Sequence, residues 1–112
     1  MAPSLDPEEA FEAALELCRR RKWAEGRKAF QDLAIGNSKE KRFRIHMHYA
    51  WAKEYLDLGR TEEARSELRR ALSLDADFRP AERTLAELPP PRDDKPYGGL
   101  FSKLFRMNQG HY

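Results

Sequence analysis

The chain has one cysteine, Cys18, among its 112 residues. A single cysteine cannot form a disulfide within the chain, and it cannot supply the several thiolates of a cysteine-based metal cluster. No stretch of eighteen apolar residues occurs, and no apolar run of signal-peptide length follows Met1. These absences predict a cytoplasmic protein with no membrane-spanning helix.

The sequence also has little that indicates catalysis or nucleic-acid binding. The formal net charge is only +2, which is too small to argue for nucleic acid. Gly98 and Gly99 lack the strand, helix and lysine of a phosphate-binding loop. His46 and His48 are two residues apart, so on a helix they diverge by about 200° and cannot hold one metal ion together. We therefore expect no catalytic, cofactor-binding or metal-binding residues, and we predict that the protein is not an enzyme.

The stretch 45–78 predicts two helices joined at Gly59. Apolar residues recur at helical spacing before Gly59 and again after it. Gly59 can adopt the left-handed conformation that ends a helix. Thr61 follows as the expected N-cap of the second helix, with Glu62 and Glu63 where the helix dipole favours negative charge. Small residues at Ala64 and Ala71 would let the two helices approach closely.

This stretch resembles the tetratricopeptide repeat (TPR). The residues at the positions of the family pattern are His48, Trp51, Ala52, Tyr55, Gly59, Ala64, Leu68, Ala71 and Ala76. Tyr55, Gly59, Ala64 and Ala71 match the pattern outright, whereas His48, Trp51 and Ala76 depart from it. The resemblance implies an all-α fold, a right-handed solenoid of antiparallel helix hairpins with about five helices.

A second, more degenerate repeat precedes the central one. Asp6, Pro7 and Glu9 form a helix-opening signal, and the first helix ends in a basic run at 19–22. In the next helix, about 24–35, Gly26, Phe30 and Leu33 stand where the central repeat has Ala64, Leu68 and Ala71. The offset is 38 residues each time (64 − 26). The repeats are predicted at about 7–36 and 45–78.

The remaining segments are assigned from composition. Residues 1–5 are predicted to be a disordered start, and residues 39–44 a backward extension of the third helix to about twenty residues. A short fifth helix is expected between Asp77 and Leu88, as a cap at 79–88 with Pro80 in its first turn. Residues 89–99 read as a Pro/Gly linker and 100–112 as a tail with a short amphipathic helix. The tail's apolar residues are Leu100, Phe101, Leu104 and Phe105.

The family resemblance implies a function, which is to bind a peptide or helix of another protein on the concave surface formed by the first helix of each pair. Transferred onto this chain, the expected partner-binding residues are Phe11, Leu15, Arg19, His46, Tyr49, Lys53, Leu56 and Arg83. This mixed apolar and basic lining suggests an amphipathic, somewhat acidic peptide. The chain is thus expected to be a protein–protein interaction adaptor or scaffold.

Several alternatives stay open at this point. The tail, 100–107, packs back on its own domain or on a neighbouring copy, docks on another protein as a short helix, or lies on a membrane surface. The alternative function is a membrane-peripheral or assembly subunit that is anchored by this tail. Two repeats and a cap are few for a stable stack, so self-association is a further expectation. The basic clusters 19–22 and 39–44 would form an anionic-partner patch if they converge, and are otherwise solvated charge.

Overall fold

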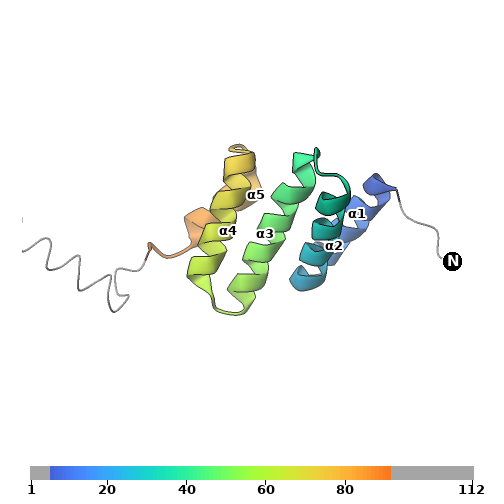
Figure 1. Ribbon diagram of the computed structural model, residues 1–112. Coiled ribbons are helices and arrows are strands. Elements are labelled where there is room, and N and C mark those ends of the chain that lie inside the picture. Colours follow the sequence, from blue (N-terminus) through green and yellow to red (C-terminus); the bar gives the residue numbers. More distant parts are fainter. Residues whose placement is uncertain (1–5, 92–112) are drawn as a thin grey trace, which may run out of the picture.

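The computed structural model describes residues 6–91, and within that range it has five helices and no strand (Figure 1). The helices are α1 (Pro7–Arg19), α2 (Trp23–Gly36), α3 (Lys41–Asp57), α4 (Thr61–Leu74) and α5 (Arg79–Glu87). The prediction of an all-α fold with five helices is confirmed for this range. None of these helices combines the length and apolar character needed to cross a bilayer.

Each helix packs against its neighbour in sequence, α1 on α2, α2 on α3, α3 on α4 and α4 on α5. The connections are short turns, so α1, α3 and α5 run in one direction while α2 and α4 return (Figure 1). Consequently, equivalent ends of the three odd-numbered helices lie on the same side of the molecule.

The centre of the α3–α4 contact is built from small side chains. Ala52, Ala64, Leu68 and Ala71 are each 0% exposed. Alanine at three of these four positions brings the helix backbones close together, and Leu68 fills the space beside them. The predicted role of Ala64 and Ala71 agrees with their complete burial.

Aromatic side chains form the core between α1, α2 and the start of α3. Phe30 and Phe43 are 1% exposed, and Phe11 packs against both rings at centroid distances of 5.6 and 5.7 Å. Gly26 allows α2 to approach α1, because a Cβ at this position would lie 2.6 Å from Cys18 Sγ. The α1–α2 contact therefore uses a glycine where the α3–α4 contact uses Ala64.

Two of the turns contain a residue in the left-handed region. Gly59, between α3 and α4, has φ 74°, as its position after the helix predicts. Arg21, between α1 and α2, has φ 61°, which is uncommon for a residue with a side chain. The Arg21 N–H donates to the Cys18 carbonyl and the Lys22 N–H donates to the Leu17 carbonyl, so these bonds close the end of α1.

The predicted helix starts are only partly correct. Asp6 is the N-cap of α1, and its Oδ1 accepts from the Glu9 N–H at 2.9 Å. Thr61 is instead the first residue of α4, because the turn closes from the Arg60 carbonyl to the Ala64 N–H at 3.1 Å. The α3 helix begins at Lys41 and has 17 residues, so the basic stretch extends it less than predicted.

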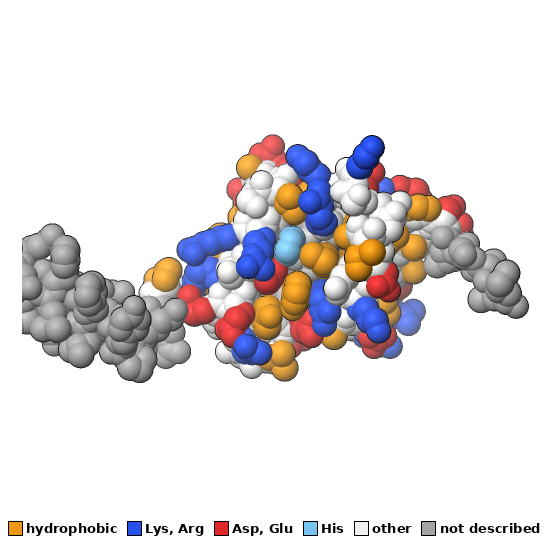
Figure 2. Space-filling model, in the orientation of Figure 1, with side chains coloured by type: hydrophobic (Ala, Val, Ile, Leu, Met, Phe, Trp, Pro, Cys, Tyr) orange, Lys and Arg blue, Asp and Glu red, His pale blue; other side chains and the backbone are white. Residues whose placement is uncertain are grey.

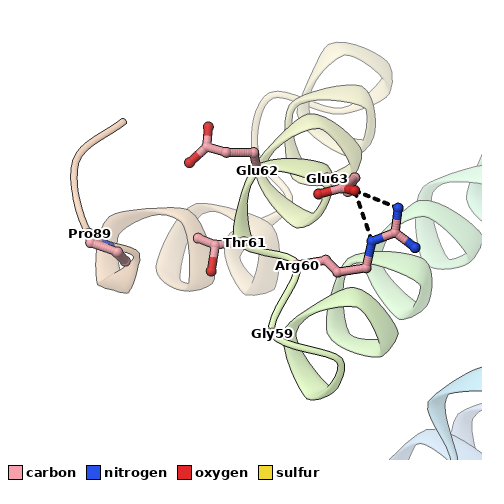
Figure 3. A pocket seen from close by; sticks show the side chains of 6 residues that line it. All are labelled: Gly59, Arg60, Thr61, Glu62, Glu63 and Pro89. Atoms are coloured by element: carbon pink, nitrogen blue, oxygen red, sulfur yellow. Dashed lines mark hydrogen bonds and ion pairs between the residues drawn. The ribbon is translucent and has the colours of Figure 1, made fainter. Parts of the chain in front are cut away.

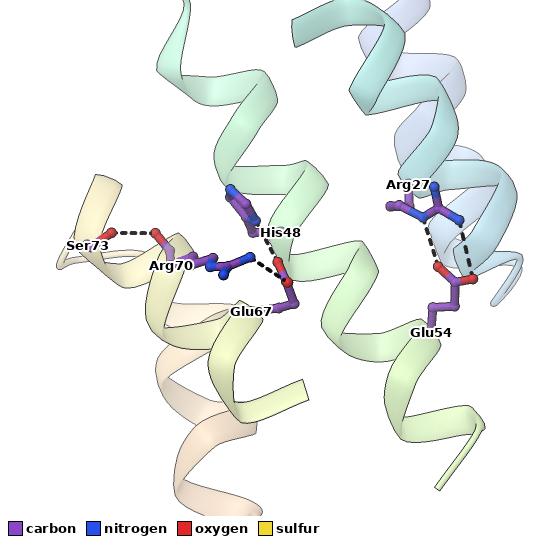
Figure 4. A network of polar contacts seen from close by, with 6 residues as sticks. All are labelled: Arg27, His48, Glu54, Glu67, Arg70 and Ser73. Carbon is purple, nitrogen blue, oxygen red and sulfur yellow. Dashed lines mark hydrogen bonds and ion pairs between the residues drawn. The ribbon is translucent and has the colours of Figure 1, made fainter. Parts of the chain in front are cut away.

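Polar side chains tie the helices together outside the apolar core (Figure 4). Arg27 on α2 pairs with Glu54 on α3 at 2.8 Å. His48 Nδ1 on α3 lies 2.7 Å from Glu67 Oε1 on α4, and the other oxygen of Glu67 accepts from Arg70 at 3.0 Å. Glu67 is only 5% exposed, so its charge is buried together with these partners.

The surface shown in Figure 2, where α2, α3 and α4 face the viewer, carries acidic and basic side chains interspersed over its area. Apolar side chains gather near the middle of this face, over α3. Among the described residues the exposed large apolar side chains are Ile35 and Leu58. This face therefore has no extended patch of one charge.

Candidate functional site

The strongest candidate site is an apolar pocket of about 260 Å³, here called the His46 pocket. Its residues come from α1, α2, α3 and the junction between α4 and α5, and they are Leu15, Cys18, Arg19, Phe30, His46, Tyr49, Phe78 and Pro80. Small-molecule sites usually enclose about 300–1,000 Å³, so this pocket suits one or two side chains better than a drug-sized ligand.

The His46 ring lies at the centre of an aromatic cluster in this pocket. Its centroid is 5.0 Å from that of Phe11, 5.4 Å from that of Phe30 and 5.1 Å from that of Phe78. The Phe11 and Phe78 rings meet it edge to face. Tyr49 extends the cluster through Phe78, at 5.7 Å. The sequence left open whether His46 faces the groove or solvent, and these contacts fix the position of its imidazole in the pocket.

The electrostatics of the pocket favour uncharged groups. Burial lowers the pKa of His46 to about 4, and the nearby Arg42 guanidinium contributes in the same direction. Burial raises the pKa of the Cys18 thiol to about 11. At neutral pH the imidazole is therefore neutral and the thiol protonated. This is opposite to an activated nucleophile, which needs a thiolate stabilised by a nearby positive charge.

Basic side chains lie at the edge of this pocket. Arg19 is one helical turn beyond Leu15, and its side chain is 60% exposed while paired with Glu16 at 2.7 Å. Lys53 is one turn beyond Tyr49, and its Nζ lies 5.5 Å from the centroid of the Trp23 ring. The site thus combines an apolar interior with a positively charged margin.

Five of the eight residues expected to bind a partner belong to this site or its edge. Leu15, Arg19, His46 and Tyr49 line the pocket, and Lys53 follows Tyr49. Phe11 is 7% exposed, so it supports His46 from the core and has little surface to offer a partner.

The other two expected residues lie outside the pocket lining. Leu56 packs against the α3–α4 core and is partly buried. Arg83 is exposed on α5, one turn beyond Pro80. Leu56 is therefore placed for packing, and Arg83 for contact with a partner at the edge of the site.

Sequence reasoning missed the residues that close the pocket. Phe30 reaches it from α2, Phe78 from the N-cap of α5, and Pro80 from the first turn of α5. Phe78 carried a usable signal, because it is a large aromatic residue directly before a helix that opens with Pro80. Phe30 carried no such signal. Its spacing predicts a core position, but spacing alone does not show that a core ring also lines a pocket open to solvent.

The pocket is not the largest cavity among the described residues. A cavity of about 540 Å³ is lined by Gly59, Arg60, Thr61, Glu62, Glu63 and Pro89 (Figure 3). Arg60 and Glu63 pair with each other at 2.6 Å, and Glu62 pairs with Arg65. Its lining has one apolar side chain, Pro89, and no aromatic ring.

The two basic clusters do not converge. Arg42, in the 39–44 cluster, donates to Glu8 at the start of α1 at 3.2 Å. The 19–22 cluster lies at the other end of the same helix, about 17 Å further along it. The hypothesis of one joint anion-binding patch is therefore wrong, because the two clusters lie at opposite ends of α1. In addition, Arg19, Arg20 and Arg42 each pair with a carboxylate.

Other expectations concern residues that the structure does not describe. Leu100, Phe101, Leu104 and Phe105, together with the linker beyond residue 91, lie outside the described residues. Within 6–91, no group of three or more histidine, cysteine, aspartate or glutamate side chains is placed to hold a metal ion. His48 is directed at Glu67 and His46 at the aromatic cluster.

Comparisons with protein-family models, with curated proteins and with solved structures found no match to this chain. The function proposed below is therefore argued from the residues and their arrangement.

Proposed function

We propose that this protein is a non-enzymatic interaction module of tetratricopeptide type, which holds a segment of a partner protein at the His46 pocket. The observation that carries the proposal is the pocket itself, an apolar recess open to solvent and lined from α1, α3 and the α4–α5 junction. Protein interfaces concentrate their binding energy in such recesses, where one anchoring side chain is desolvated.

The repeat character is supported by agreement between the two helix pairs. Gly59 and Arg21 have the same left-handed backbone and are 38 residues apart (59 − 21). The same offset relates Ala64 to Gly26, and both positions are buried where the paired helices approach most closely. A repeated turn and a repeated close approach are what two copies of one structural unit would produce.

An adaptor role is also supported by the chemistry of the pocket. Its histidine is neutral and its cysteine protonated at neutral pH, so neither is prepared for acid–base or nucleophilic work. The aromatic contacts around His46 give the pocket a fixed shape. Binding without turnover is the activity that these features favour.

The proposal is tested by placing a carboxylate in the pocket. Leu15→Glu puts a charge among apolar side chains, and Ile35→Glu makes the same change at a side chain that is 74% exposed and outside the pocket. We expect affinity capture from the source cell, read by mass spectrometry, to recover a partner with the wild-type chain and with Ile35→Glu. Leu15→Glu should lose that partner while its circular dichroism stays helical.

A partner that is recovered equally by both variants would place the binding surface elsewhere. Removing residues 100–112 then distinguishes the alternative of a tail-anchored subunit. Loss of liposome association in that truncated chain, with the Leu15→Glu chain behaving as wild type, would favour the tail over the pocket.

A further inference from the structure

The cations at the edge of the His46 pocket share one orientation. Arg19 follows Leu15 by four residues, Lys53 follows Tyr49 by four, and Arg83 follows Pro80 by three. Each cation is thus about one helical turn beyond a pocket residue, on the same face of its helix. Since α1, α3 and α5 run in one direction (Figure 1), each cation is displaced from its pocket residue in the same direction, towards the C-terminal end of its helix.

These cations have little internal compensation. Among residues 6–91, neither Lys53 nor Arg83 forms an ion pair with a carboxylate, and the Lys53 Nζ lies over the face of the Trp23 ring. Arg19 pairs with Glu16, but both side chains are about half exposed, and such pairs are easily exchanged for another partner. Asp57 and Glu87 stand a further turn along α3 and α5, and they moderate the positive charge without neutralising it at the pocket.

We propose that the partner is a protein segment that inserts one bulky uncharged side chain into the His46 pocket and places carboxylates on the side marked by Arg19, Lys53 and Arg83. This inference rests on the proposed function and specifies the partner that it requires. The pocket favours an uncharged anchor, because apart from Arg19 its lining consists of apolar and aromatic side chains, a neutral imidazole and a protonated thiol. The cations then select acidic flanking residues through charge complementarity.

The chain's own tail is a poor fit for this site on charge. The apolar residues 100–105 are accompanied by Lys103 and Arg106, with no acidic residue between 100 and 112. Placing them beside the three cations brings like charges together, which disfavours that arrangement. A separate acidic segment is the occupant that the charges favour.

The test is a selection from a randomised twelve-residue peptide display library on the immobilised full chain, with counter-selection on Leu15→Glu. The enriched peptides should combine a phenylalanine, leucine or methionine with neighbouring aspartate or glutamate. A synthetic peptide of the consensus should bind the full chain in fluorescence anisotropy, and its lysine-substituted counterpart should bind roughly three- to tenfold more weakly, the range expected for a few screened charges.

Charge reversal on the protein provides the matched control. A triple variant should bind the acidic peptide about tenfold or more weakly and the lysine-substituted peptide more tightly than the wild type. Its substitutions are Arg19→Glu, Lys53→Glu and Arg83→Glu. Lys28→Glu, Lys41→Glu and Arg69→Glu give the same change in net charge at exposed positions outside the pocket, and should change either affinity by less than about twofold.

The possible failures are distinguishable. Enrichment of apolar peptides irrespective of charge, or of basic ones, would overturn the acidic-partner inference and leave the proposed function standing. Peptides that bind wild type and Leu15→Glu equally would overturn both. Enrichment that appears only after Phe101→Ala and Phe105→Ala would show that the chain's own tail fills the pocket, and the inference would fall.

Discussion

Arg21 and Gly59 adopt the same left-handed backbone conformation, with φ values of 61° and 74°, at equivalent ends of α1 and α3. Glycine takes this conformation without steric cost, whereas the Cβ of arginine is crowded by its own backbone. The first turn is thus a strained copy of the second. Within residues 6–91, the exposed Arg21 side chain forms no hydrogen bond or ion pair that would offset the strain.

We expect Arg21→Gly to stabilise the fold by about 0.5–1 kcal/mol, the relief of left-handed strain less the added entropy of glycine in the unfolded chain. The measurement is the free energy of unfolding from urea titrations followed by circular dichroism. Arg20→Gly is the control, because Arg20 is also exposed but has φ −85°. It should destabilise, and equal effects of the two changes would contradict the strain argument.

Gly26→Ala should destabilise the wild-type protein by roughly 1–3 kcal/mol, the usual cost of overpacking a tight contact. The new Cβ would lie 2.6 Å from Cys18 Sγ, while its next contact, the Ala14 carbonyl oxygen at 3.5 Å, is ordinary. In a Cys18→Ala background the clash is absent, so the same change should stabilise through helix propensity. A double-mutant cycle checks this, and additive effects would show that Cys18 is not the obstacle.

Glu67→Ala should cost about 1–3 kcal/mol, because it leaves the half-buried His48 and the Arg70 guanidinium without their shared acceptor. Thermal and urea unfolding measure the loss. Ser66→Ala is a matched change on the same helix, at an exposed residue whose side chain forms no hydrogen bond within residues 6–91, and it should be nearly neutral. A similarly small effect of Glu67→Ala would mean that water replaces the carboxylate without penalty.

Stability should fall as the pH is lowered from about 6.5 towards 4, through His46. In the unfolded chain an imidazole takes up a proton near its ordinary pKa of about 6.5. In the native protein the pKa of His46 is about 4, so the unfolded state binds more protons throughout this window and stability rises with pH. The full contribution is on the order of 3 kcal/mol or less.

His46→Leu keeps the side chain apolar and removes this titration. The pH dependence of its unfolding free energy between 6.5 and 5 should therefore be shallower than that of the wild type. NMR titration of the His46 ring gives an independent reading. A native pKa near 6.5, or equal slopes for both proteins, would contradict the buried neutral imidazole.

Much of the fold follows from local sequence signals. The start of α1 follows from Asp6 and Pro7, and the end of α3 follows from Gly59 after an apolar helical stretch; the structure agrees with both. Thr61 shows the limit of such signals, because a capping residue type stands one position inside the helix it was expected to open. Propensity favours a boundary but does not fix it, and tertiary contacts decide the last residue.

The site was less predictable than the fold. The resemblance to the tetratricopeptide repeat implied Leu15, His46 and Tyr49 as partner-binding residues, and these three line the pocket. Phe78 and Phe30 join them only through tertiary packing, which spacing within one helix cannot reveal. The two basic clusters are separated because α1 and α3 run in the same direction, which puts the end of α1 and the start of α3 on opposite sides of the molecule; the contact of Arg42 with Glu8 shows this.

Phe78 and Pro80 belong to the chain leading into the short helix α5, and they complete a recess whose other residues belong to α1, α2 and α3. Occupation of the recess and docking of α5 are therefore linked equilibria. Fraying of α5 lowers the observed affinity, because only the molecules in which α5 is docked can bind the partner. By the same coupling, a bound partner segment slows amide hydrogen exchange in α5.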